Sequence, residues 1–357
     1  MNPFSKKEIF SLAVIFIFVF ALVFGSRNLR LYSPAAITAE QTVSLLLDEP
    51  ARLDELPGLL DSLEVDYDSE ELLWAGRIHG WRNFRPGRYE INGGISYPDF
   101  LSKMARGIQD ATMVTVLPGT DIDRLSMLLS LQLQADAGEF KEVFSDSSEV
   151  ALELGLTGEE LFSRMLPNTY QVYWTSSAEN IIKRIHSEFE TLISNRYQDQ
   201  INQHRFNLNE IVTLASIVEW EARFKEEKAK ISGLYLNRLD RNMRLQADPT
   251  VLYALGEKRR ILFEDYQFDH PYNTYMNGGL PPGPITNPDE TSIAAVLEPE
   301  EHDYLFMVAT PEGGHAFTRT FEEHREVSEE WRRWIREQYR IRDQREREEA
   351  INASSPD

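Results

Sequence analysis

The sequence predicts an α+β protein in which a folded body follows a single N-terminal transmembrane helix. Two observations favour this arrangement. One uncharged apolar run extends from Ile9 to Phe24, and the rest of the chain alternates short strand-like segments with segments of helical periodicity. With 357 residues, the chain is long enough for about two folded units behind the helix.

The apolar run is predicted to be a membrane anchor over residues 9–26. As a helix, Ile9 to Phe24 covers about 24 Å, and the flanking residues extend it toward the ~30 Å of a hydrocarbon core. A cleaved signal peptide is the alternative, but the run is longer than the usual apolar region and no small-x-small cleavage site follows it closely. We expect residues 1–8 to be a short cytoplasmic segment and the body to be extracytoplasmic.

Composition excludes several classes of protein. Lys and Arg number 37 against 58 Asp and Glu, a net charge of −21, so most of the surface would repel a nucleic acid. The chain has no cysteine, which excludes disulfides, thiolate nucleophiles and cysteine zinc sites. A globular protein that does not bind nucleic acid is therefore expected.

A small domain is predicted over residues 36–111. Its expected elements are a strand at Gln41–Leu47, helices at Leu53–Leu63 and Glu70–Gly80, a turn and strand at Phe84–Ile91, and a helix at Tyr97–Gly107. Units of this kind occur in glycan-binding modules, and a domain that serves only for packing or as a spacer fits equally well.

The second domain is predicted over residues 112–324. It begins with a strand and turn at Val114–Gly119 and a helix at Asp121–Leu133, and continues with loops rich in Pro, Asn and Tyr. Residues 325–357 are expected to form a charged C-terminal helix. In that helix Val327, Trp331, Trp334 and Ile335 make an apolar stripe that would pack on the body, whereas Arg340–Glu349 would face solvent.

One helix offers a candidate general acid. Asn207 and Glu210 have the spacing of a helix N-terminal capping box, and the helix is expected over Ile211–Arg223. Its apolar residues form one stripe, and Glu219 lies on the edge of that stripe, about 160° around the helix from Glu221. A carboxyl at such an edge should be partly desolvated, which raises its pKa. An edge Glu that only pairs with a nearby cation is the competing interpretation.

Other chemistries lack their motifs. The sequence contains no Gly-x-Ser-x-Gly, no Ser-x-x-Lys and no His-Glu-x-x-His, and no phosphate-binding glycine loop precedes a helix. No metal site and no cofactor are predicted.

The polar segments resemble the YceG-like endolytic murein transglycosylases. The resemblance covers about residues 80–324 and is carried by segments in the same order as in that family: Ala215–Glu221, Asn237–Leu239, Met243–Val251, Tyr272–Tyr275, Gly279–Ile285 and Gly314–Phe317. The chain departs from the common pattern at Ser163–Tyr170 and at Asn242, which bears on the glycan subsites.

The resemblance implies an enzyme that cleaves the β-1,4 bond between N-acetylmuramic acid and N-acetylglucosamine within peptidoglycan strands without water, leaving 1,6-anhydro ends. It also implies a LysM-like small domain, location in the cell inner membrane with a periplasmic body, and peptidoglycan synthases as partners. Glu219 falls on the catalytic Glu of the family. The supporting or substrate-binding positions are Glu221, Glu227, Asn237, Gln246, Asp248, Tyr272, Asn273 and His315.

Two other functions stay open. A hydrolysing muramidase would need a second carboxylate, for which Glu221 and Asp248 are candidates. A non-catalytic glycan-binding scaffold would use the same cleft for binding only, although the presence of Glu219 argues against it.

Overall fold

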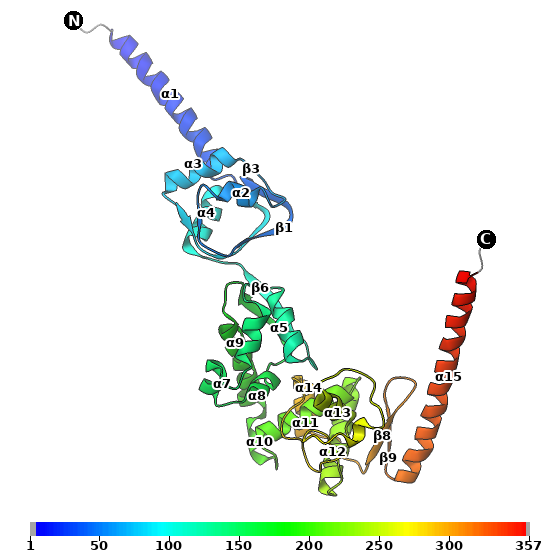
Figure 1. The fold of residues 1–357 in the computed structure, drawn as a ribbon. Coiled ribbons are helices and arrows are strands. Elements are labelled where there is room, and N and C mark those ends of the chain that lie inside the picture. The colour runs from blue at the N-terminus through cyan, green and yellow to red at the C-terminus, as the bar shows by residue number, and fades with distance from the viewer. Residues whose placement is uncertain (1–4, 355–357) are drawn as a thin grey trace. The chain divides into compact units, whose positions relative to one another are not determined.

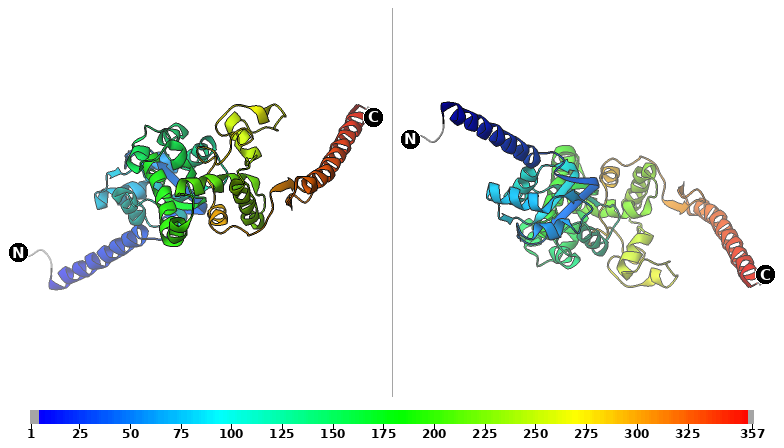
Figure 2. Two further views of the ribbon diagram at one scale, coloured as in Figure 1. Left: turned by 90° about the horizontal axis from the view of Figure 1, so that it is seen from below. Right: turned by 90° about the horizontal axis from the view of Figure 1, so that it is seen from above.

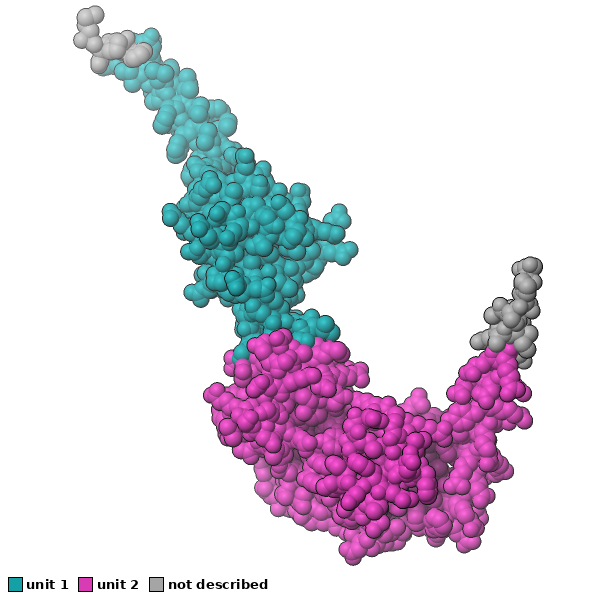
Figure 3. All heavy atoms as spheres, viewed as in Figure 1, with its two compact units in different colours: residues 1–114, 130–135, 171–177 teal, residues 115–129, 136–170, 178–357 magenta. Residues whose placement is uncertain are grey.

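The structure is a computed structural model that describes residues 5–354. The predicted segment 1–8 and the predicted tail 325–357 each extend beyond that range. The chain forms two compact units (Figure 3). The first comprises the chain up to Val114 together with Ser130–Ala135 and Gln171–Ser177, and the second comprises the remainder. The sequence predicts one linear boundary near residue 112, whereas two later segments also belong to the first unit.

Helix α1 (Lys6–Leu31) contains the whole apolar run (Figure 1). It begins after Ser5, whose hydroxyl accepts a hydrogen bond from the backbone N–H of Glu8. The apolar side chains of the run are exposed, as expected for a helix that has no protein around it. Among the described residues, α1 is the one helix long and apolar enough to cross a membrane, a test that an N-terminal signal sequence also passes.

The first unit is built around an antiparallel three-stranded sheet in the order β3-β1-β5. Its strands are β1 (Ile37–Leu47), β3 (Asp66–Tyr67) and β5 (Gly87–Ile95), and a separate pair joins β2 (Ala51–Arg52) to β4 (Asn83–Phe84). Helices α2 (Leu56–Leu60), α3 (Ser69–His79) and α4 (Tyr97–Arg106) complete the unit. Its core includes Leu56, Leu72, Phe84 and Phe100, all at 1 % exposure or less.

The helix expected at Leu53–Leu63 is shorter in the structure. Residues 51–52 pair with β4 as a strand and residues 53–55 form a turn, so only Leu56–Leu60 is helical. The other predicted elements of this unit are confirmed to within a few residues. Gly107 ends α4 with a φ of 70°, a left-handed conformation that favours glycine.

The second unit is mostly helical. Its first part contains α5 (Ile122–Ser130), α6 (Ala137–Val143), α7 (Glu149–Leu154), α8 (Gly158–Ser163), α9 (Ala178–Leu192), a π-helical turn (Ile193–Tyr197) and α10 (Gln198–Gln203). The chain passes between the two units within β6 (Ala111–Val116) and within β7 (Asn168–Tyr173), and again at residues 129–130, 135–136 and 177–178.

Helix α11 (Leu208–Glu221) lies at the centre of the second unit, in contact with α8, α12 (Lys228–Asp240), α13 (Asp248–Leu255) and α14 (Glu290–Leu297). The predicted capping box of Asn207 and Glu210 is confirmed. The stripe residues Ile211, Leu214, Ala215 and Val218 are buried as predicted, but burial is not confined to that stripe, because every side chain from Ile211 to Val218 is buried. The helix ends at Glu221 because Ala222 has an extended backbone.

The C-terminal part adds a hairpin and a long helix. Strand β8 (Phe306–Ala309) pairs antiparallel with β9 (His315–Thr318), and α15 (Phe321–Ser354) follows the hairpin and contacts both strands (Figures 1 and 2). Two short 3-10 turns, Lys225–Glu227 and Asp265–Gln267, complete the described elements.

Candidate active site

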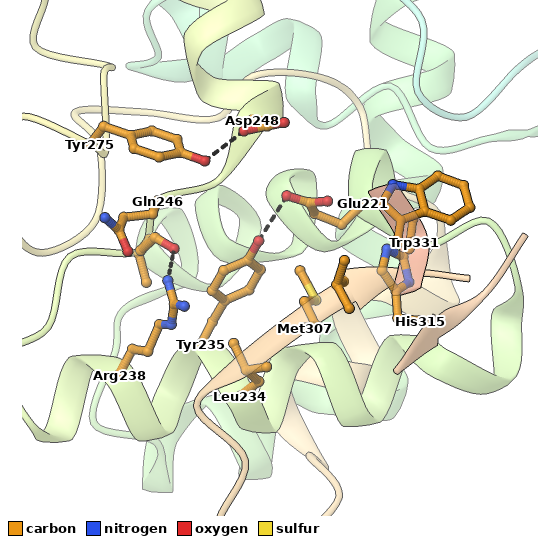
Figure 4. A pocket seen from close by; sticks show the side chains of 13 residues that line it. Glu221, Leu234, Tyr235, Arg238, Gln246, Asp248, Tyr275, Met307, His315 and Trp331 are labelled. Atoms are coloured by element: carbon orange, nitrogen blue, oxygen red, sulfur yellow. Dashed lines mark hydrogen bonds between the residues drawn. The ribbon is translucent and has the colours of Figure 1, made fainter. Parts of the chain in front are cut away.

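The second unit contains a pocket of about 340 Å³ between α11, α12, the start of α13, the hairpin and α15 (Figure 4). Both polar and apolar side chains line this pocket. The lining residues are Glu221, Leu234, Tyr235, Arg238, Leu245, Gln246, Asp248, Tyr275, Met307, Val308, Ala309, His315 and Trp331.

Glu221 is the carboxyl whose proton affinity is most changed. It is the last residue of α11, and its Oε1 accepts a hydrogen bond of 2.9 Å from the Tyr235 hydroxyl. Burial raises the pKa of Glu221 to about 7, and the negative charge of Asp248 acts in the same direction. The hydrogen bond from Tyr235 and the positive charge of Arg238 oppose this shift. Glu221 therefore exchanges a proton readily near neutral pH.

A second carboxyl, Asp248, lies in the same pocket (Figure 4). It begins α13, where Pro249 in the first turn suits a helix start. The Tyr275 hydroxyl donates a hydrogen bond of 2.6 Å to Asp248 Oδ1. Burial raises the pKa of Tyr275, and the charge of Asp248 adds to that effect. Tyr275 therefore stays protonated and holds the carboxylate in place.

Gln246 reaches the pocket from a strained backbone. Its φ is 51°, in the left-handed region that residues other than Gly and Asn rarely adopt. The Gln246 N–H donates to Thr274 O at 3.2 Å, and the next N–H, of Ala247, donates to Thr274 Oγ1 at 3.0 Å. This buried anchoring to Thr274 keeps the segment before Asp248 in its conformation.

Arg238 connects the segments that surround the pocket. Its side chain is 7 % exposed and donates to Leu305 O and Leu245 O, each at 2.6 Å. The guanidinium therefore joins α12 to the segment before β8 and to the segment before Gln246. Within the part of the chain that the structure describes, no carboxylate forms an ion pair with Arg238, and its positive charge acts to lower the pKa of Glu221.

His315 lies on the hairpin wall of the pocket. Both its backbone N–H and its Nδ1 contact the carboxylate of Glu227, at 2.8 and 3.0 Å. Glu227 itself does not line the pocket, so its contribution is to orient His315.

Glu219 lies in a different environment, a buried ionic network. Its Oε2 accepts from Lys228 Nζ at 2.9 Å, from the Asp289 N–H at 3.0 Å and from Ser292 Oγ at 2.7 Å. Lys228 also binds Asp289 Oδ1 at 2.9 Å. Burial alone would raise the pKa of Asp289, but the hydrogen bond from Lys228, with those from Thr291 and Ser292, lowers it. Glu219 thus ties α11 to the starts of α12 and α14.

Three further predicted site residues hold the chain together outside this pocket. Asn237 donates to His302 O at 2.7 Å and Tyr304 O at 3.2 Å. The Tyr272 hydroxyl donates to Glu159 at 2.8 Å. Asn273 is fully buried and bonds to the backbone of its own loop, including Tyr275 N–H at 2.9 Å. The pocket therefore brings together Glu221, Gln246, Asp248 and His315 from the predicted set.

Sequence reasoning did not select Tyr235, Tyr275 or Trp331 as site residues. Tyr275 belongs to one of the segments that carry the family resemblance. Nothing in the linear sequence indicates that its hydroxyl lies next to Asp248. Trp331 was assigned to a packing stripe of the C-terminal helix. Across residues 5–354, no cluster of three His, Asp or Glu side chains has an arrangement that could hold a metal ion.

Comparison with known proteins agrees with the resemblance in the sequence. The chain belongs to the YceG-like family, whose sequence model matches residues 52–330. It is 28% identical over 317 residues to the endolytic murein transglycosylase of Bacillus subtilis (strain 168), which covers 84% of this chain and 88% of that protein.

An endolytic murein transglycosylase of Streptococcus pneumoniae is 25% identical over 333 residues, or 83% of this chain, and the match spans 60% of the pneumococcal protein. The crystal structure of a yceG-like protein from Listeria monocytogenes superposes with a TM-score of 0.57 at 28% identity. That match covers 81% of this chain and 99% of the Listeria chain. The predicted family is confirmed.

Proposed function

We propose that this protein is an endolytic peptidoglycan lytic transglycosylase. It cleaves the β-1,4 bond between N-acetylmuramic acid and N-acetylglucosamine inside a glycan strand and leaves a 1,6-anhydro-N-acetylmuramic acid end. The observation that carries this proposal is Glu221, a pocket carboxyl whose pKa lies at about 7 in a chain of the YceG-like family.

The proposal moves the catalytic role from Glu219 to Glu221. Both residues belong to the same segment of the resemblance, which implied the catalytic position for Glu219 and a supporting position for Glu221. Glu219 is held by Lys228, Asp289 and Ser292 and does not line the pocket, whereas Glu221 does. A proton donor has to reach the glycosidic oxygen, which favours Glu221.

One carboxyl suffices for this reaction. The protonated Glu221 donates its proton to the glycosidic oxygen as the bond from that oxygen to C1 breaks. The resulting carboxylate then takes the proton of the C6 hydroxyl as its oxygen bonds to C1, which restores the acid. Because attacking and attacked atoms belong to one sugar, the attack is intramolecular. No water and no cofactor enter this sequence.

Asp248 is compatible with two different catalytic mechanisms. In the transglycosylase, its negative charge would stabilise the positive charge that develops at C1 and would keep the pKa of Glu221 high. The second candidate function is a hydrolysing muramidase, in which Asp248 would be the second carboxylate. The product distinguishes the two, since hydrolysis leaves reducing ends.

The proposed location is the cell inner membrane, with α1 as a single-pass anchor and the body in the periplasm. The length and apolar composition of α1 support an anchor. A LysM-like glycan-binding role for the first unit, and peptidoglycan synthases as partners whose products are cut during elongation, are proposed from the family resemblance alone.

The test is to identify the product by its mass. Purified protein is incubated with uncrosslinked glycan strands, and the new ends are identified by mass spectrometry. Anhydro ends made by the wild type and absent with Glu221→Gln are the expected result. Reducing ends would replace the proposal with the muramidase, and intact strands that still bind would replace it with a glycan-binding protein.

A further inference from the structure

The pocket that contains Glu221 has one wall from the C-terminal helix. Trp331 of α15 lines this pocket together with Met307, Val308 and His315 of the hairpin (Figure 4). In Figure 4, Glu221 lies between Asp248 on one side and Trp331 with His315 on the other. The segment that matches the family model ends at residue 330, so this wall comes from the part of the chain directly beyond it.

The start of α15 is held firmly enough to present a side chain. The His324 ring stacks on Phe306 of β8 at 5.4 Å between ring centres, and Phe321 contacts the same ring at 6.1 Å. Ser328, one turn further, is 6 % exposed. These contacts place the first turns of α15 on the hairpin.

The Trp331 ring is itself supported. Trp334, three residues later, stacks on it at 4.9 Å between ring centres with an angle of 17° between the planes. An i,i+3 pair lies on one side of a helix, so Trp334 limits the rotamers that Trp331 can adopt. Residue 331 is partly exposed, as a side chain that meets a ligand must be.

A flat apolar ring beside a general acid suits a sugar. One face of a pyranose ring presents mainly C–H groups, which pack on an aromatic plane while the hydroxyls around the ring edge bond to polar side chains. The pocket combines both kinds of contact, with Met307 and Val308 beside Trp331 and with Gln246, Asp248 and His315 as polar partners. Its other aromatic residues, Tyr235 and Tyr275, direct their hydroxyls to carboxylates.

We propose that Trp331 is a glycan-binding residue whose indole forms the wall of a sugar subsite next to Glu221. The first turns of α15 then belong to the active site. This inference rests on the proposed function, since the occupant of the subsite is taken to be the glycan strand.

The test compares full-length variants at residue 331 on uncrosslinked glycan strands. We expect Trp331→Ala and Trp331→Leu to raise KM about tenfold while kcat changes less than about threefold, because a ground-state contact is lost and the acid is intact. Trp331→Phe should restore most of the affinity. Arg333→Ala, an exposed change on the same helix, is the matched control and should leave both constants unchanged.

A binding measurement separates this inference from the proposed function. In the Glu221→Gln background, calorimetry with the same strands should show Kd rising by a similar factor when Trp331→Ala or Trp331→Leu is added. This result is independent of whether the wild type makes anhydro ends. Unchanged KM and Kd in both variants would overturn the role of Trp331. Unfolding of both variants, with Trp331→Phe folded by circular dichroism, would also overturn it, because the ring would then serve packing.

Discussion

At the scale of single residues, two carboxyls two positions apart on α11 have opposite roles. Glu221 meets the pocket with a raised pKa, and Glu219 accepts three hydrogen bonds inside a buried ionic network. The same isosteric change at each position should therefore have different consequences, one for activity and the other for stability.

We expect Glu221→Gln to reduce the formation of anhydro ends by at least about 10² to 10⁴, the usual effect of losing a general acid. Its thermal stability should stay near that of the wild type, because the native carboxyl is already largely desolvated. Glu219→Gln should retain measurable activity but lose about 2 kcal/mol of stability, since Lys228 loses one of its two carboxylate partners in a buried site.

Mass spectrometry of the product and urea unfolding measure the two effects on the same preparations. If Glu219→Gln proved inactive and fully stable while Glu221→Gln stayed active, the assignment would return to Glu219.

The pH profile of the enzyme should report Glu221. Because the acid must be protonated to start the reaction, kcat/KM should fall as pH rises through about 7. The hydrogen bond from Tyr235 lowers the pKa of Glu221 and the charge of Asp248 raises it. Tyr235→Phe should therefore move this fall in kcat/KM to higher pH, and Asp248→Asn should move it to lower pH.

Rates measured between pH 5 and 9 with both variants test this prediction. A shift in the same direction for both variants, or a fall that does not move, would exclude Glu221 as the group that titrates.

At the scale of elements, α11 is the helix that carries both carboxyls, and its N-terminus depends on local hydrogen bonds. Asn207 Oδ1 accepts from the Glu210 N–H at 3.0 Å, and Glu210 Oε2 accepts from the Asn207 N–H at 2.9 Å. Asn207→Ala removes the first of these bonds and should cost about 1 kcal/mol of stability, whereas Asn207→Asp keeps an acceptor and should cost less. Urea unfolding of both variants measures this, and equal losses would argue against the cap.

The sequence predicted the position and the N-terminal cap of this helix, but not which of its faces are buried. The capping box and the helix after it are local features, and both were predicted correctly. Burial extends beyond the predicted stripe because α11 is surrounded by other helices, so the side chains on all its sides from Ile211 to Val218 are buried, including the polar Thr213 and Ser216. In a helix of this kind, periodicity does not tell which polar residue at the end faces a pocket.

At the scale of the whole molecule, α1 predicts the topology. Protease added to spheroplasts should digest the body at sites beyond Arg27, because an anchored body on the outer face of the membrane is accessible. A cytoplasmic marker protein should stay intact in the same sample. Protection of the body until the membrane is permeabilised would contradict the proposed location.

The sequence by itself determined the class of the protein. The apolar run, the capping box and the ordered polar segments are each local in the chain. The family match confirmed the family that the ordered polar segments predicted, and the structure confirmed the capping box. The apolar run forms a helix long and apolar enough to cross a membrane. Only the tertiary structure decided the composition of the pocket, because its members come from α11, α12, the start of α13, Tyr275, the hairpin and α15. It also separated Glu221 from Glu219. The two share one motif, and what differs is the set of distant residues that each one meets, Tyr235 and Asp248 for Glu221 and Lys228 and Asp289 for Glu219.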